Sequence, residues 1–287
     1  FFRFFFQIFL LNKELKKNKC EILFVPGGTY LGSFKPFVTM CRNMLPFEKK
    51  ERDRYRYSLM YFKLLLLRTL QLITFKNANG IIFLSNYAQK TIFNMIPKNL
   101  KFEKKTQIIP HGVNKKYFFR KRENLPSFKS KNLIKCVYTS TIDKYKHQNN
   151  IIKAISNLRK KNYKFELHLI GSSNKFELKN LKKTLKKIDP KKKFIFYKGS
   201  LVTDEIIKIY KDTDLFIFGS TCENLPNILL EKMATGIPII SSKKEPMTEV
   251  LKNGGIYFDA ESVLSIEKAL LQTIELDKRL HIKAEIA

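Results

Sequence analysis

Short apolar runs that alternate with helical patterns constrain the fold of this chain more than any other feature. Helical patterns at 57–75, 148–160, 175–188 and 262–276 lie between many of the apolar runs. Nearly every residue of each run is apolar, which is typical of strands buried on both faces of a parallel sheet. The alternation predicts an α/β protein built from βαβ units. The expected strands are 21–25, 80–84, 107–110, 134–139, 165–170, 194–197, 214–218, 237–241 and 255–258.

A polar, basic segment divides the chain. Residues 113–130 contain Pro126 and show no clean period, so we expect a linker there. About three expected strands precede the linker and about six follow it. This division predicts an incomplete N-terminal domain over 1–112 and a complete doubly wound domain over 131–287.

The charge balance leaves two interpretations open. The chain carries 55 Lys and Arg against 25 Asp and Glu, a net charge of +30. An anionic partner such as nucleic acid or a membrane surface would use this charge, but the lysines are spread over the whole chain, as a purely compositional bias would leave them. The four cysteines form no CxxC pair, which favours a reducing cytoplasm and neither zinc nor disulfides.

The most informative segment covers residues 216–240, where an expected buried strand leads through a polar loop into an expected helix. Pro226 fits the first turn of that helix, Gly236 fits its terminator, and Pro238 opens the next strand. Ligands of parallel α/β sheets bind at the carboxyl edge of the strands. The first amides of the helix offer a site for a phosphate at that edge.

Two carboxylates, Glu223 and Glu231, bracket this unit with seven residues between them. A carboxylate accepts two hydrogen bonds at once, which suits the hydroxyl pairs of a sugar or a ribose. The alternative is a helix cap and a surface glutamate. Their placement around a strand end and a helix start favours the ligand-binding interpretation.

The segment resembles the donor motif of the family-4 (group 1) glycosyltransferases of the GT-B fold. The sequence IIPHGVN at 108–114 looks like the "IPNGV" signature of the family, and 138–147 is similar to its "GRL…KG" loop. The resemblance implies that Lys146 holds the diphosphate of the donor. Thr141 stands where the family has arginine, and Lys144 is the candidate to supply that charge.

The resemblance implies two Rossmann-like domains whose parallel sheets face each other across a cleft, with the first domain incomplete and the C-terminal helix cut short. Residues 42–47 resemble the acceptor-side element of the family, with Arg42 as a catalytic candidate in place of a histidine, or as a surface arginine. Glu223 would hold the donor sugar as the second catalytic candidate, and Glu231 would hold the ribose. The other donor-binding candidates are Gly171, Gly199, Ser200, Asn224, Leu225 and Pro226.

These expectations describe a glycosyltransferase that moves a sugar from a nucleoside-diphosphate sugar to a hydroxyl acceptor. The resemblance implies retention of anomeric configuration, no metal or other cofactor, and a glycan or lipid-linked acceptor in polysaccharide or lipopolysaccharide synthesis. The expected location is the cytoplasm, with the mixed apolar and basic helix around 61–68 as a candidate for peripheral membrane contact. The alternatives are an inactive sugar-nucleotide-binding scaffold and a basic protein that binds nucleic acid or anionic membrane.

Overall fold

A six-stranded parallel sheet in the order β10-β9-β8-β5-β6-β7 organises the second half of the chain. The computed structural model describes residues 5–96, 105–119, 127–277 and 280. Its strands are apolar and largely buried, as expected for a sheet covered on both faces. They are β5 (Ile134–Thr139), β6 (Phe165–Ile170), β7 (Ile195–Tyr197), β8 (Leu215–Phe218), β9 (Ile239–Ser242) and β10 (Ile256–Phe258).

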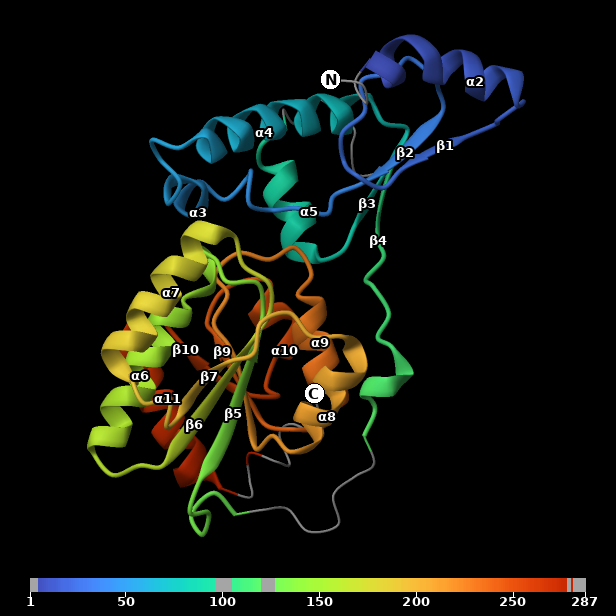
Figure 1. Cartoon of the computed structure of the whole chain (residues 1–287). Helices are drawn as coiled ribbons and strands as arrows, with labels where there is room; N and C mark the ends of the chain where they lie inside the picture. Colours follow the sequence, from blue (N-terminus) through green and yellow to red (C-terminus); the bar gives the residue numbers. More distant parts are fainter. Residues whose placement is uncertain (1–4, 97–104, 120–126, 278–279, 281–287) are drawn as a thin grey trace. The chain divides into compact units, whose positions relative to one another are not determined.

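Helices cover both faces of this sheet. The helices α6 (Gln148–Lys160), α7 (Lys175–Ile188) and α11 (Val263–Leu276) lie on one face, and α8 (Thr203–Lys211), α9 (Asn227–Ala234) and α10 (Met247–Leu251) lie on the other (Figure 1). Strand order reverses between β5 and β8, which are neighbours in the sheet although β6 and β7 separate them in the chain. The carboxyl ends of β5 and β8 therefore form the position where ligands of doubly wound sheets bind.

A second parallel sheet, β1-β2-β3-β4, lies in the first half of the chain. Its strands are β1 (Leu23–Val25), β2 (Phe37–Met40), β3 (Gly80–Phe83) and β4 (Thr106–Ile108). The strand β2 was not expected from the sequence, because it is only four residues long and its alternating FVTM pattern lacks a continuous apolar run. The helices are η1 (Phe6–Leu10), α2 (Leu11–Lys17), α3 (Lys49–Asp53), α4 (Leu59–Asn77) and α5 (Asn86–Phe93).

The chain divides into two compact units. The first contains Phe1–His111 together with Cys222–Leu225, and the second contains Gly112–Thr221 together with Pro226–Ala287. The described part of the expected linker packs on the second unit, where Tyr117 and Phe128 are buried in the core. Residues 120–126 of that linker lie outside the described residues.

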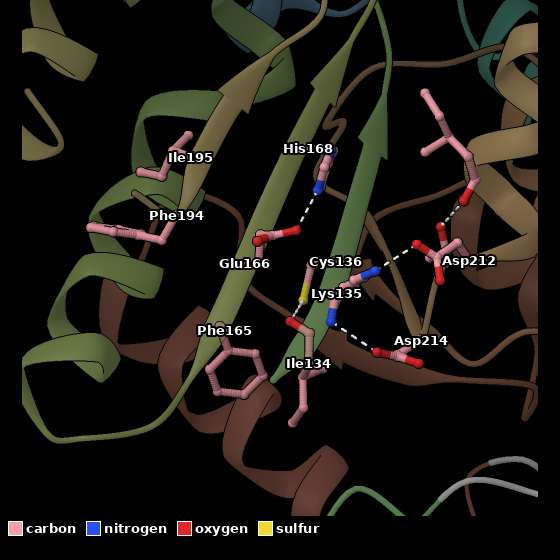
Figure 2. A network of polar contacts seen from close by, with 12 residues as sticks. Ile134, Lys135, Cys136, Phe165, Glu166, His168, Phe194, Ile195, Asp212 and Asp214 are labelled. Atoms are coloured by element: carbon pink, nitrogen blue, oxygen red, sulfur yellow. Dashed lines mark hydrogen bonds and ion pairs between the residues drawn. The ribbon is translucent and has the colours of Figure 1, made fainter. Parts of the chain in front are cut away.

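Near the amino ends of the strands in the second sheet, charged groups are paired with each other (Figure 2). The amide of Lys135 donates to Asp214 Oδ2 at 2.9 Å, and Lys135 Nζ donates to Asp212 Oδ2 at 2.5 Å. In β6, His168 Nε2 lies 2.7 Å from Glu166 Oε1. Each of these carboxylates thus has a partner within the same unit.

Candidate functional site

The segment between β8 and β9 has the strand–loop–helix form expected from the sequence, with one difference. Pro226 occupies the cap position before α9, with φ −78° and ψ 82°, and the first helical residue is Asn227. The carbonyl of Pro226 accepts hydrogen bonds from the amides of Leu229 and Leu230 at 2.8 and 3.1 Å. Because proline has no N–H, the first amide at this helix start belongs to Asn227.

The end of α9 agrees with the prediction. Gly236 has a φ of +68°, in the left-handed region that a glycine enters at little cost. The strand β9 begins three residues later, directly after Pro238.

The loop residues Cys222–Leu225 group with the first unit. There, Asn224 Nδ2 donates to the carbonyl of Cys41 at 2.7 Å, and the carbonyl of Asn224 accepts from Ser85 Oγ at 2.8 Å. The candidate Arg42 follows Cys41 in the chain and is exposed just after β2. Glu223 and Leu225 flank Asn224 and are both half-buried. The structure thus brings the side chain of Asn224 to the carbonyl of the residue that precedes Arg42.

The other predicted cations lie in the second unit, in the short helix η4 (Lys144–Lys146) that follows β5. Lys144 is exposed, whereas Lys146 is only 6% exposed, with its Nζ 4.9 Å from the ring centroid of Tyr145. The hydroxyl of Tyr138 donates to the carbonyl of Lys146 at 2.8 Å. The amide of Thr221 donates to the carbonyl of Tyr145 at 2.9 Å. These two bonds tie η4 to the carboxyl ends of β5 and β8.

Glu231 is half-buried in α9 and is hydrogen-bonded to the hydroxyl of Tyr117. Burial raises the pKa of Glu231, while the Tyr117 hydroxyl and the charge of Lys232 lower it. Burial, followed by the charge of Glu231, raises the pKa of Tyr117 to about 12, so its hydroxyl stays protonated and donates. Sequence reasoning missed Tyr117, because it lies in a polar segment without a period and only its position in space joins it to Glu231.

Lys232 is the second functional candidate that sequence reasoning missed. Its side chain is completely buried in α9, and Nζ donates to the carbonyl of Ile217 in β8 at 3.0 Å. A lysine is rarely fully buried, so nothing in its sequence context predicts this position.

The remaining donor-binding candidates follow β6 and β7 at the same edge of the sheet. The amide of Gly171 donates to the carbonyl of Gly199 at 2.7 Å, and Ser200 is exposed beside them. Gly171 has a φ of +144°, and a Cβ there would overlap the carbonyl of Ser140 at the end of β5. The glycine is therefore required by close backbone approach, whatever ligand lies nearby.

The second unit thus offers cationic and hydrogen-bonding groups in one region. Lys146 and the start of α9 suit a phosphate group. The carboxylate of Glu231 suits a pair of hydroxyls. A ligand that carries both a phosphate and a sugar ring would match this combination.

Solved structures with the same architecture support the fold. The chain is similar to HepE of Anabaena, crystallised in complex with UDP and glucose, with a TM-score of 0.66 at 17% identity over 88% of this chain and 65% of that one. It is also similar to a glycosyltransferase of Rickettsia africae (TM-score 0.67, 17% identity, 99% of this chain and 75% of that chain). A UDP-forming α,α-trehalose-phosphate synthase of Burkholderia xenovorans matches with a TM-score of 0.69 and 12% identity, over 96% of this chain and 72% of that chain.

These similarities confirm the expected fold class, α/β of the GT-B type with two parallel sheets. The chain spans 65% of the length of HepE. Comparison with curated proteins gave no match. The family model described as glycosyl transferases group 1 matches residues 119–286, which is more than half of the chain. The chain therefore belongs to the group 1 glycosyl transferase family.

Proposed function

We propose that this protein transfers a sugar from a nucleoside-diphosphate sugar to a hydroxyl acceptor, and that the second unit binds the donor. The observation that carries the proposal is the buried Lys146, held after β5 in the same unit as the start of α9 and Glu231. An ammonium group and the first amides of a helix are both groups that bind phosphate oxygens in proteins. Their occurrence in one unit therefore suits the diphosphate of a donor.

Each candidate has a role in this proposal. Lys146 and Lys144 hold the diphosphate together with the backbone amides near Leu225 and Pro226. Glu231, oriented by Tyr117, holds the ribose, and Glu223 and Asn224 hold the donor sugar. Gly171, Gly199 and Ser200 line the nucleotide, and Arg42 steadies the charge that develops on the departing phosphate.

We also propose a reaction that retains anomeric configuration and needs no metal. Lysine side chains would neutralise the charge of the leaving diphosphate in place of a metal ion. Among the residues that the structure describes, no cluster of three or more His, Cys, Asp or Glu could hold a metal ion. An unchanged transfer rate after treatment with a chelator is the expected result.

A binding and turnover assay tests the donor proposal. UDP-, GDP- and ADP-sugars are titrated by calorimetry, and hydrolysis and transfer to hydroxyl acceptors are followed with the donor that binds. The substitutions Lys146→Ala and Glu231→Gln should each weaken donor binding at least tenfold. The matched control is Lys186→Ala, because Lys186 is exposed in the last turn of α7.

The outcomes separate the alternatives. If Lys146→Ala and Glu231→Gln bind the donor as the wild type does, the proposed site is wrong. Donor binding without transfer to any acceptor would favour a non-catalytic scaffold. Binding to nucleic acid that falls steeply with salt and ignores both substitutions would favour a polyanion-binding protein.

An exposed apolar stripe on α4 supports a further part of the proposal, peripheral association with an anionic membrane on its cytoplasmic side. Leu59, Phe62, Leu66 and Ile73 lie three, four and seven residues apart and are 90%, 64%, 61% and 45% exposed. Lysines beside the stripe, including Lys63, add positive charge. This pattern suits a helix that lies in a membrane interface, where a lipid-linked acceptor of polysaccharide or lipopolysaccharide synthesis would be found. In the described residues no helix is both long and apolar enough to span a bilayer.

Vesicle sedimentation tests this part. The protein should bind vesicles that contain anionic lipid, and the double substitution Phe62→Ser with Leu66→Ser should reduce binding about tenfold while leaving donor affinity unchanged. Lys186→Ala again serves as the control. Equal binding of the double variant and the wild type would show that α4 is not the membrane contact.

A further inference from the structure

Lys232 is a buried charge that the assigned roles do not use. Its side chain is 0% exposed, and its Nζ lies 5.2 to 5.5 Å from the ring centroids of Tyr138, Phe216 and Phe218. In the part of the chain that the structure describes, the ammonium group donates to the carbonyl of Ile217 and to no carboxylate. Aromatic faces and one carbonyl stabilise an ammonium only partly, so this group lacks full compensation.

A second buried lysine, Lys146, lies near one of these three rings, the ring of Phe218. The Nζ of Lys146 is 5.9 Å from the centroid of Phe218, and the Nζ of Lys232 is 5.5 Å from it. The two lysines come from different elements, η4 and α9, and meet at the end of β8. Two buried cations that share one neighbour repel each other, and this repulsion favours the neutral form of one of them.

The groups around Lys232 act on its pKa in both directions. Burial is the main cause that lowers the pKa of Lys232, to about 7; the carboxylate of Glu231 opposes the shift and the ammonium of Lys146 adds to it. From β5, Tyr138 places its ring beside Lys232 and donates its hydroxyl to the carbonyl of Lys146. The neutral and charged forms of Lys232 are thus close in free energy near neutral pH.

We propose that Lys232 is a positioning residue that takes up a proton from solvent when the diphosphate of the donor binds at Lys146, and releases it when the nucleotide leaves. The proposal rests on the proposed function. In the empty site Lys232 is neutral above pH 7, which relieves repulsion with Lys146. A bound diphosphate brings two negative charges, which favour the ammonium form. The regained charge stabilises the leaving diphosphate when the glycosidic bond breaks and its charge grows.

Calorimetry in buffers of different ionisation enthalpy measures this uptake. The probe is the sugar nucleotide that the wild type binds among UDP-glucose, GDP-mannose and ADP-glucose, since their diphosphates do not titrate near neutral pH. At pH 8 we expect uptake of at least about half a proton per donor bound. The Lys232→Met variant should show no uptake and about tenfold weaker binding.

Two further variants separate charge from structure. Lys232→Arg keeps a charge that cannot be lost, so it should bind without proton uptake. Lys186→Met changes an exposed lysine in α7 and should keep both the affinity and the uptake of the wild type. Thermal unfolding of each variant checks that it is folded.

The outcomes distinguish this inference from the proposed function. If none of the sugar nucleotides binds the wild type, the proposed function fails and the inference falls with it. If a donor binds without proton uptake, or if folded Lys232→Met and wild type take up the same number of protons, the role of Lys232 is overturned and the donor site stands.

Discussion

At the scale of single residues, the second unit places Lys146, Glu231 and Lys232 where their charges act on one another. Burial pushes Glu231 and Lys232 toward their neutral forms, and their mutual attraction opposes this. Neither effect can be read from residue type alone. Because this balance sets the protonation of Glu231 and Lys232, a change of pH should affect both groups.

Lys232 should make the stability of the protein depend on pH. Its pKa in the folded state is about 7, against an ordinary value of 10.5. Between these values the unfolded chain binds a proton that the folded chain lacks, so stability rises with pH across this interval. The Lys232→Met variant should be more stable than the wild type by roughly 5 kcal/mol at pH 6, at about 1.36 kcal/mol per pH unit. The difference should shrink steadily toward pH 10.

Urea unfolding of the two proteins at pH 6, 7, 8, 9 and 10 provides the measurement. Lys186→Met is the control and should follow the wild type at every pH. A stability difference that stays constant over this range would contradict the prediction.

The bond between Tyr117 and Glu231 supports a second prediction at this scale. The hydroxyl of Tyr117 lowers the pKa of Glu231, so Tyr117→Phe should raise that pKa further. Loss of one hydrogen bond to a charged group costs about 1.5 kcal/mol, or about a tenfold loss of affinity. Donor binding by Tyr117→Phe should therefore be weaker than in the wild type, and the loss should be larger at pH 5.5 than at pH 8. Titrations at both pH values measure it, and an equal loss at both would contradict the pKa argument.

At the scale of elements, α9 is a short helix between two buried strands, and its two ends have separate physical causes. Pro226 caps the start, and Gly236 allows the left-handed turn after the end. The same eight residues carry both Glu231 and Lys232, so the position of the helix sets the position of both charges.

Gly236→Ala should destabilise the protein by about 1 kcal/mol, because φ is +68° and a Cβ there meets nothing within 4 Å. The cost is therefore one of backbone conformation and not of packing. Gly112→Ala is a matched control, because a Cβ at Gly112 also meets nothing within 4 Å and its φ is not in the left-handed region. Chemical unfolding should show little change for Gly112→Ala. Equal effects of the two substitutions would contradict this explanation.

At the scale of the whole molecule, the net charge of +30 acts on every anionic ligand. Exposed lysines interact through solvent and are screened within about 8 Å at physiological salt, whereas buried charges are screened much less. The donor and a nonspecific polyanion should therefore respond differently to salt.

Between 50 and 500 mM NaCl, donor affinity should fall only a few-fold, since the ligand carries only two charges and one of the lysines that hold it, Lys146, is buried. Affinity for double-stranded DNA, if any is measured, should fall by roughly 10³-fold or more over the same range. Calorimetry and fluorescence anisotropy provide the two curves. Curves of equal steepness would indicate that exposed charge, and not the site around Lys146, binds the donor.

The sequence by itself determined the α/β class, the parallel strands and the bounds of α6 and α7, since each depends on a local pattern of apolar residues. It also identified the glycine that ends α9. Only the tertiary structure decided that β2 is a strand, that Tyr117 bonds Glu231, and that Lys232 is buried against three rings. The physical reason is that periodicity is a property of neighbours along the chain, whereas burial and pKa depend on groups that the fold brings together from distant segments.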